Sequence, residues 1–247
     1  MIIKENIYYS PAGQDRTLHV YLPDNYDSSE ERYPVMYFFD GHNLFCDEDA
    51  TYGKSWGLKT FLDGWSKHMI VVGIECSHEG FRRLDEYSPY NGRLMGYDIH
   101  GTGKETMDWI TGTLKPYVDS QLRTYPFRTA TGIAGSSMGG LMSLYAVTMY
   151  NHIFSKAACV SSAIGFTRRA VMADLQRASL DPDTRVFLSW GEREDFRNYA
   201  SRDNHEVQNL LREKNVSTQL LRQQGGGHNE ADWEKLVPGF MEYLWMS

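Results

Sequence analysis

Cysteine is scarce in this sequence, and the few that occur exclude two common ways of stabilising a small fold. The three residues, Cys46, Cys76 and Cys159, are odd in number and widely spaced, and no two form a C-x-x-C pair. Such a set suits neither a disulfide framework nor a zinc knuckle. We therefore expect reduced thiols.

Positive charge and long apolar runs are scarce as well. The 25 Lys and Arg residues are outnumbered by 32 Asp and Glu, which gives a net charge of −7 and a pI of about 5.6. This balance argues against nucleic acid or an anionic membrane as the main partner. No apolar run approaches the roughly 20 residues that span a bilayer, and the first residues lack a signal-peptide pattern. We expect a cytoplasmic protein.

Internal repeats and linker-like stretches rich in Pro, Gly or Ser are also missing, which bears on the number of domains. A chain of 247 residues has room for two domains, but α/β folds of this size are often single. We expect one domain, residues 1–247, with a sizeable core. The oligomeric state stays open.

Short apolar runs alternate with helical patterns along most of the chain. An antiparallel hairpin is expected over 2–10 and 16–22, followed by buried strands at 35–39, 69–74, 131–134, 157–160 and 185–190 and by a strand-like run at 217–221. Helices are expected over 55–68, 102–122, 201–214 and 229–244. This order predicts an α/β sandwich with a mostly parallel sheet. The stretch 76–101 lacks periodicity and is expected to be a long loop that forms a substrate wall.

Residues 135–140 read Gly-Ser-Ser-Met-Gly-Gly and fit the G-x-S-x-G nucleophile elbow. They lie between a strand-like run and a helix-like one, which is the context that the motif requires. The glycines leave room for a sharp, strained turn that exposes the serine hydroxyl. Ser137 is therefore a candidate catalytic nucleophile, and the N–H of Met138 is half of a candidate oxyanion hole.

A serine nucleophile needs a base and an acid, which in this fold follow it in the order serine, acid, histidine. His228 follows three glycines between a strand and the last helix, whereas His205 lies in a polar helical segment and is expected at the surface. We expect His228 to be the base. The acid is expected in the loop after residue 191, where Glu194 is the first candidate and Asp195 the second.

The second oxyanion donor is expected in the loop after the strand at 35–39. The N–H of His42, directly after Gly41, is the first candidate, and that of Asn43 is the alternative. A competing reading treats His42 and the acids at 47–49 as a metal site, but no tight ligand spacing supports it. We expect no metal.

Four segments, 37–41, 135–140, 190–194 and 224–229, together resemble the putative esterase (esterase D-like) family of α/β-hydrolases, over about residues 33–244. That family includes feruloyl and acetyl xylan esterases of carbohydrate esterase family one, enterochelin-type siderophore esterases, S-formylglutathione hydrolases and mycolyltransferases. The resemblance implies an α/β-hydrolase fold with helices on both faces of the sheet. It also assigns the nucleophile to Ser137, the base to His228, the acid to Glu194 and the oxyanion donors to Met138 and His42.

Two departures from the family pattern bear on substrate and mechanism. Asp40 precedes Gly41 where the family often has His-Gly, so the substrate cannot be inferred from this loop. Glu194 stands where Asp is commoner, with Asp195 directly behind it, which leaves the acid open.

The expected function is that of a serine carboxylic-ester hydrolase, acting through an acyl-enzyme on acetyl or feruloyl esters of carbohydrates or phenols, without metal or cofactor. The partner is then a small-molecule or oligosaccharide ester. Alternatives are a siderophore esterase, an S-formylglutathione hydrolase-like thioesterase, an acyltransferase with the same triad, and a binding protein without turnover. Residues that either line the substrate pocket or cover core are Asn43, Tyr87, Tyr90, Arg93 and Phe166.

Overall fold

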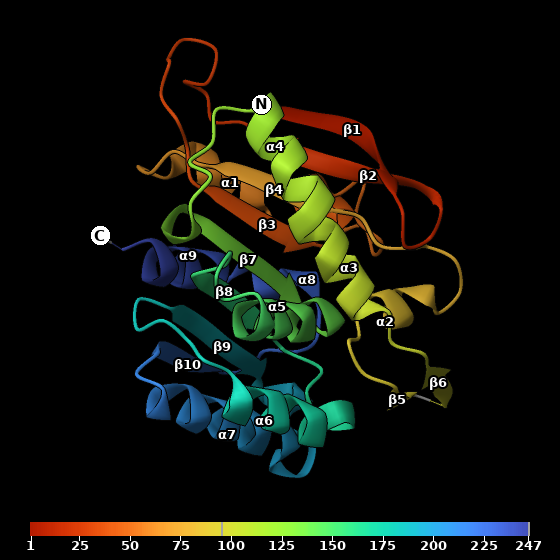
Figure 1. Ribbon diagram of the computed structural model, residues 1–247. Helices are drawn as coiled ribbons and strands as arrows, with labels where there is room; N and C mark the ends of the chain where they lie inside the picture. The colour runs from red at the N-terminus through yellow and green to blue at the C-terminus, as the bar shows by residue number, and fades with distance from the viewer. Residues whose placement is uncertain (95, 247) are drawn as a thin grey trace.

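The computed structural model describes residues 1–94 and 96–246 (Figure 1). Its strands are β1 (Ile2–Tyr9), β2 (Gln14–Tyr21), β3 (Val35–Phe39), β4 (Ile70–Ile74), β5 (Gly92–Leu94), β6 (Tyr97–Ile99), β7 (Thr131–Ser136), β8 (Lys156–Val160), β9 (Arg185–Gly191) and β10 (Ser217–Gln223). The helices are α1 (Leu58–Gly64), α2 (Arg82–Glu86), α3 (Gly103–Trp109), α4 (Lys115–Gln121), α5 (Met138–Met149), α6 (Arg168–Arg177), α7 (Tyr199–Glu213), α8 (Glu230–Glu234) and α9 (Val237–Trp245).

Eight strands form the central sheet in the order β1-β2-β4-β3-β7-β8-β9-β10. β1 pairs with β2, and β2 with β4, in antiparallel register, while the pairs from β4 through β10 are parallel. The expected N-terminal hairpin and mostly parallel sheet are confirmed. Because parallel strands present their carboxyl ends at one edge, the loops after β3, β4, β7, β8 and β9 meet there.

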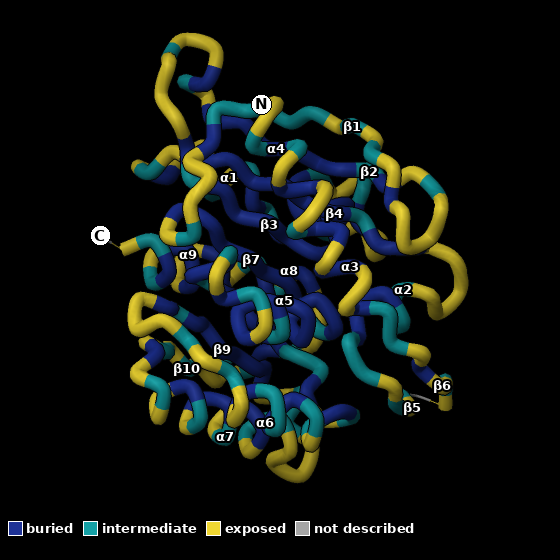
Figure 2. The backbone as a smooth tube through the Cα atoms, in the orientation of Figure 1, coloured by how far each residue is buried: buried dark blue, intermediate teal, exposed yellow. Residues whose placement is uncertain are grey.

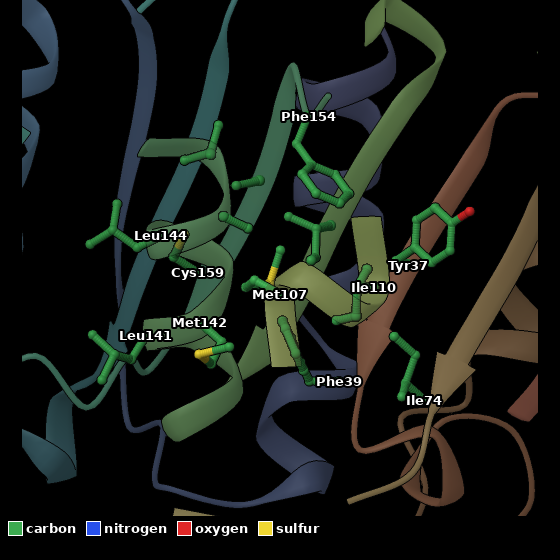
Figure 3. Close-up of a cluster of buried hydrophobic side chains, with 14 of the residues drawn as sticks. Tyr37, Phe39, Ile74, Met107, Ile110, Leu141, Met142, Leu144, Phe154 and Cys159 are labelled. Atoms are coloured by element: carbon green, nitrogen blue, oxygen red, sulfur yellow. The ribbon is translucent and has the colours of Figure 1, made fainter. Parts of the chain in front are cut away.

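Two apolar cores lie on opposite faces of the sheet, which is dark blue at the centre of Figure 2. Side chains of α3, α4, α5, α6 and α7 contribute to the larger core, part of which Figure 3 shows. α1, α8 and α9 contribute to the smaller one. Helices on both faces explain why β3, β4 and β7 are buried along their whole length and read as continuous apolar runs. The arrangement is the expected α/β-hydrolase fold.

The expected loop at 76–101 contains regular structure. α2 lies within it, and β5 pairs with β6 in a short hairpin; residue 95, between these strands, lies outside the described residues. Asp85 holds the hairpin to α2, because its carboxylate accepts the Tyr97 hydroxyl at 2.7 Å and the His100 N–H at 2.8 Å. These contacts join residues 12 and 15 positions apart, so local periodicity could not predict them.

Two expected helices differ in their bounds. α1 begins at Leu58 after Gly57, which has φ 57°, because Ser55 binds the Asp47 carboxylate instead of capping a helix. The expected helix over 229–244 is two helices, α8 and α9. Pro238 lies in the first turn of α9, where its missing N–H is tolerated but would interrupt a continuous helix. α6 had no counterpart among the expected helices.

The expected helix over 102–122 is present as a continuous series of α3, a π-helical turn at Ile110–Leu114, and α4. In the described part of the chain, no helix has the length and apolar character that crossing a bilayer requires.

Candidate active site

Ser137 lies at the sharp turn between β7 and α5. Its φ of 56° and ψ of −117° fall where a residue with a side chain is strained. A Cβ on Gly135 would lie 2.7 Å from the carbonyl carbon of Gly139, so the strand and helix approach this closely only because the position is glycine. The local geometry is that of a nucleophile elbow.

The end of β8 and the loop that follows it fix the backbone of Ser137 from both sides. The Ser137 N–H donates to the Val160 carbonyl at 3.0 Å, and the Ala163 N–H donates to the Ser137 carbonyl at 2.9 Å. These bonds compensate part of the strain at the turn. The serine is thus held by the neighbouring strand as well as by its own elements.

His228 and Glu194 are in direct contact. Nδ1 of His228 lies 2.7 Å from Oε2 of Glu194, which brings together loops from after β9 and before α8. Oδ1 of Asp195 instead accepts the N–H of Ser201 at 3.0 Å at the start of α7. Of the two candidate acids, Glu194 is the one placed to orient the imidazole.

The carboxylate of Glu194 is held in its ionised form. Burial raises the pKa of the carboxyl. Hydrogen bonds from His228, Ser161 and the Gly191 N–H lower it by more than burial raises it, so the pKa lies below the ordinary value. Oε1 accepts the Ser161 hydroxyl at 2.7 Å and the Gly191 N–H at 2.9 Å. An ionised acid favours a positive charge on His228 during turnover.

Ser161 and Trp233 form a second layer of support that the sequence analysis missed. The indole N–H of Trp233 donates to Oγ of Ser161 at 3.0 Å, and the Trp233 ring lies edge-on to His228 with centroids 5.1 Å apart. Ser161 follows β8 at the carboxyl edge of the sheet. That position was the available signal, because the edge also carries the nucleophile and the acid.

The loop after β3 begins with Asp40 in the left-handed region, with φ 58°, followed by a 3₁₀ turn at Gly41–Asn43. A Cβ on Gly41 would lie 2.5 Å from the carbonyl carbon of Gly73 in β4, so glycine allows the loop to rest on the sheet. The N–H of Asn43 donates to the Asp40 carbonyl at 2.9 Å, which removes Asn43 as the alternative oxyanion donor.

Met138 and His42 occupy comparable places in their turns. Met138 is the first residue of α5, and His42 is the second residue of the 3₁₀ turn. N–H groups in the first turn of a helix have no partner within it. Neither N–H group therefore has a partner within its own helical turn, and the role of both as oxyanion donors stays a prediction.

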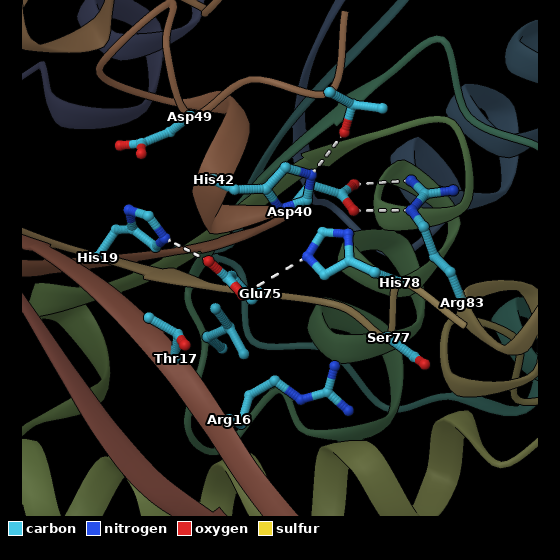
Figure 4. A network of polar contacts seen from close by, with 12 residues as sticks. Arg16, Thr17, His19, Asp40, His42, Asp49, Glu75, Ser77, His78 and Arg83 are labelled. Carbon is cyan, nitrogen blue, oxygen red and sulfur yellow. Dashed lines mark hydrogen bonds and ion pairs between the residues drawn. The ribbon is translucent and has the colours of Figure 1, made fainter. Parts of the chain in front are cut away.

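An ion pair braces the loop after β3 (Figure 4). Arg83 of α2 donates from Nε and Nη2 to the two oxygens of Asp40, each at 2.7 Å. Burial raises the pKa of Asp40, but the Arg83 guanidinium outweighs it, and the pKa lies below its ordinary value. The pair connects α2 to the residue that starts the oxyanion loop.

A cavity of about 460 Å³ lies between the elbow, the loop after β3 and the segment that carries His228. Ser137 and His228 line it together with His42, Asn43 and Glu230. The Glu230 side chain is buried, which raises its pKa, and Oε1 accepts from Nδ2 of Asn43 at 3.4 Å. Glu230 is a cleft residue that the sequence analysis did not single out.

Of the five residues that were expected to line the pocket or cover core, Asn43 lines the cavity and Tyr87 covers core. Tyr87 is 1% exposed and packs edge-on against Phe39, with ring centroids 4.8 Å apart. Its hydroxyl accepts the Asp40 N–H at 3.2 Å. Tyr87 therefore supports the oxyanion loop from within the core rather than facing a substrate.

The other three expected pocket residues lie away from the cavity that contains Ser137. The Tyr90 hydroxyl donates to Asp174 at 2.8 Å. Arg93 is exposed on β5 and lies 3.5 Å from Asp98. Phe166 lines a separate surface hollow. None of the three lines the cavity of Ser137: Tyr90 precedes β5, Arg93 lies on β5, and Phe166 lies in the 3₁₀ turn at Gly165–Thr167.

The acids at 47–49 do not form a metal site with His42. Oδ1 of Asp47 accepts the hydroxyl and the N–H of Ser55, each at 2.7 Å, and Asp49 pairs with Lys4. Among the described residues, His42 lies close to the ligand atoms of Cys76 and His78 instead.

The model of a family described as putative esterase matches residues 10–242 of the sequence. The chain belongs to the putative esterase family. It is an esterase, and the elbow, the contact between His228 and Glu194, and the cavity that Ser137 and His228 line all lie inside the matched region.

Known proteins resemble this esterase over nearly its whole length. The uncharacterized protein YbbA of Bacillus subtilis is 24% identical over 98% of this chain and 97% of its own. A ferulic acid esterase structure has a TM-score of 0.74 and 18% identity over 99% of this chain and 97% of that one. The siderophore hydrolase EstA of Aspergillus nidulans has a TM-score of 0.76 and 18% identity over 100% of this chain and 95% of that one. These structural similarities establish a shared fold.

Proposed function

We propose that this esterase is a serine carboxylic-ester hydrolase that works through an acyl-enzyme, with Ser137 as nucleophile, His228 as base and Glu194 as acid. The observation that carries the proposal is the 2.7 Å contact between Nδ1 of His228 and Glu194, because His228 lines the same cavity as Ser137. With Nδ1 engaged, Nε2 is the ring nitrogen left for the serine hydroxyl.

In the acylation step, Oγ of Ser137 attacks the ester carbonyl carbon while His228 takes the hydroxyl proton. The carbonyl oxygen becomes negative and accepts hydrogen bonds from the N–H groups of Met138 and His42. When the tetrahedral intermediate collapses, the bond to the alcohol oxygen breaks and His228 returns its proton to that oxygen. The acyl group remains on Ser137.

In the deacylation step, His228 removes a proton from water, and the resulting hydroxide attacks the acyl carbon. The same two N–H groups stabilise the second oxyanion. Collapse releases the carboxylic acid and returns the proton to Ser137. Throughout both steps Glu194 accepts a hydrogen bond from the Nδ1–H group of His228 and stabilises the imidazolium, and the proton stays on the imidazole.

The acyl group that we propose is acetyl or feruloyl, on a carbohydrate or phenolic alcohol. Arg83, a cation on the cavity wall, is already neutralised by Asp40 through two hydrogen bonds. A site whose cation is paired favours a neutral ester over a highly anionic one. Trp233 and Tyr52 add aromatic surface to the same cavity, which suits a sugar or phenolic ring.

A siderophore ester is the second candidate, because the fold is equally similar to that of the siderophore hydrolase EstA. Ester bonds in such compounds would be cut by the same two steps. The two candidates differ in the charge and size of the acyl group, so direct competition between substrates separates them.

The proposal is tested by measuring hydrolysis of p-nitrophenyl acetate, longer p-nitrophenyl esters, methyl ferulate, acetylated xylo-oligosaccharides and a catecholate trilactone. Ser137→Ala is expected to lower kcat by at least about 10³-fold on every ester that the wild type cleaves. The matched control is Ser120→Ala, which changes an exposed serine on α4. This variant is expected to keep full activity. Full activity of Ser137→Ala would reject the mechanism, and preference for the trilactone would reject the acyl assignment.

Acyl transfer is distinguished by adding an alcohol to the p-nitrophenyl acetate assay. A hydrolase releases p-nitrophenol at an unchanged rate and forms mainly acetate. A transferase forms the new ester, with faster turnover when deacylation limits the rate.

A further inference from the structure

Three side chains with metal-binding atoms come together on the wall of the catalytic cavity. They are His42, Cys76 and His78, and one potential ligand atom from each lies within 4.8 Å of the other two. β3 and β4 are parallel neighbours whose last residues, Phe39 and Ile74, are paired in register. The loops that follow therefore leave the sheet side by side and bring His42 to Cys76 and His78.

The imidazole of His42 has one nitrogen without a partner. The residue is 5% exposed, and its Nε2 lies 2.9 Å from the hydroxyl of Thr51. Among the residues described by the structure, Nδ1 is buried and has no hydrogen-bond partner. A buried polar atom left unpaired destabilises a fold, so its presence points to a ligand.

The imidazole of His78 has a carboxylate near one of its ring nitrogens, a neighbour that metal-binding histidines usually have. Its Nε2 lies 3.5 Å from Oε2 of Glu75, whose other oxygen lies 2.7 Å from His19 (Figure 4). A carboxylate on one ring nitrogen sets the orientation of the ring and leaves the other nitrogen for a metal. The rings of His42 and His78 have centroids 4.7 Å apart.

We propose that His42, Cys76 and His78 form a binding site for a zinc-type divalent ion, with a fourth position open to the cavity. One sulfur and two imidazole nitrogens suit Zn²⁺ and not Mg²⁺ or Ca²⁺, which prefer oxygen. All three side chains line the cavity that Ser137 lines. The ion replaces the thiol proton of Cys76, so binding forms a metal–sulfur bond and releases one proton to solvent.

The three ligand atoms, which lie within 4.8 Å of one another, need to approach only slightly when the ion binds. With Zn–S and Zn–N bonds of about 2.3 and 2.0 Å, one sulfur and two nitrogens in tetrahedral positions lie about 3.3–3.5 Å apart. The side chain of His78 is 58% exposed and is free to move the remaining distance, whereas Cys76 and His42 are both at most 5% exposed. This site differs from the one that the sequence analysis weighed, which combined His42 with the acids at 47–49.

The test uses the full chain, stripped of metal, in two titrations. Calorimetry with Zn²⁺ is expected to show one ion per chain. With Co²⁺, coordination by Cys76 is expected to give a thiolate-to-cobalt charge-transfer absorption. Cys76→Ser should abolish that absorption, and the matched control Cys46→Ser should retain it. His78→Ala should raise the Kd for Zn²⁺ more than about 10-fold, the lower limit for losing even a group that only supports a ligand, whereas His100→Ala should not.

Circular dichroism and melting curves establish that each variant is folded. His78→Ala changes a mostly exposed side chain, so it decides the question if Cys76→Ser does not fold. Failure of wild type to bind Zn²⁺ saturably, or equal losses in His78→Ala and His100→Ala, would overturn the proposal. Because every readout is binding, it stands or falls separately from the ester-hydrolysis mechanism.

Discussion

Both carboxylate oxygens of Glu194 have partners before any substrate is present. Oε2 contacts His228, and Oε1 accepts from Ser161 and the Gly191 N–H. Asp195, one residue later, faces the start of α7. The sequence left the choice between these neighbouring acids open, because a turn of the backbone decides which of them faces the histidine.

Glu194→Gln is expected to lower kcat for p-nitrophenyl acetate by roughly 10³–10⁴-fold, since an amide cannot stabilise the imidazolium and favours the wrong tautomer. Asp195→Asn is expected to retain kcat within about 10-fold, because its side-chain oxygen can still accept the Ser201 N–H. Steady-state kinetics of the two variants compare them directly. A larger loss at 195 than at 194 would reverse the assignment of the acid.

Ser161 is a positioning residue, and its effect should be visible in the pH dependence. Its hydroxyl helps to hold the pKa of Glu194 below the ordinary value, so Ser161→Ala should raise that pKa. The acidic limb of the kcat/KM profile should then shift to higher pH, with a loss of roughly 10-fold at neutral pH. A uniform loss at all pH values would indicate only a structural role.

At the scale of elements, the elbow depends on close contact between β7 and α5. Gly135→Ala would place a Cβ 2.7 Å from Gly139 and should destabilise the protein by about 1–3 kcal/mol, as overpacking does, with loss of activity. Gly239→Ala is the control, because a Cβ there meets nothing within 4 Å in α9. It should stabilise the protein by about 0.5–1 kcal/mol. Urea unfolding measures both, and equal midpoints would contradict the prediction.

The elements that were predicted well are those whose signal is local. The buried strands read as apolar runs because helices cover both faces of the sheet, and the elbow combines glycines with a strand and a helix. α2 and the β5–β6 hairpin were missed because contacts between distant residues hold them. The bond between Ser161 and Trp233 spans 72 positions, and no sequence pattern reports such a contact.

At the scale of the whole molecule, the buried carboxylates make stability depend on pH. The pKa values of Asp40 and Glu194 both lie below their ordinary values in the folded protein. A carboxyl of this kind contributes stability that is fully present above its unfolded pKa and is lost as pH falls through the folded pKa. The free energy of unfolding should therefore decrease on acidification below the ordinary carboxyl range.

Asp40→Asn tests this account. It should destabilise the protein at neutral pH by up to about 3 kcal/mol, because Arg83 loses its partner, and should reduce the further loss on acidification. Urea midpoints between neutral and acidic pH give both quantities. The same acid slope in wild type and variant would exclude Asp40 as a source of the pH dependence.

Residues 160–163, which end β8 and begin the loop after it, contact Ser137 and Glu194 directly and His228 through Trp233. This segment binds the backbone of Ser137 on both sides, holds Glu194 through Ser161, and meets the tryptophan that lies against His228. Thermal motion of this segment would therefore carry nucleophile, acid and base along together and preserve their spacing. The β5–β6 hairpin is held by Asp85 instead, so insertions there can change the surface of the molecule during evolution while the reacting groups keep their alignment.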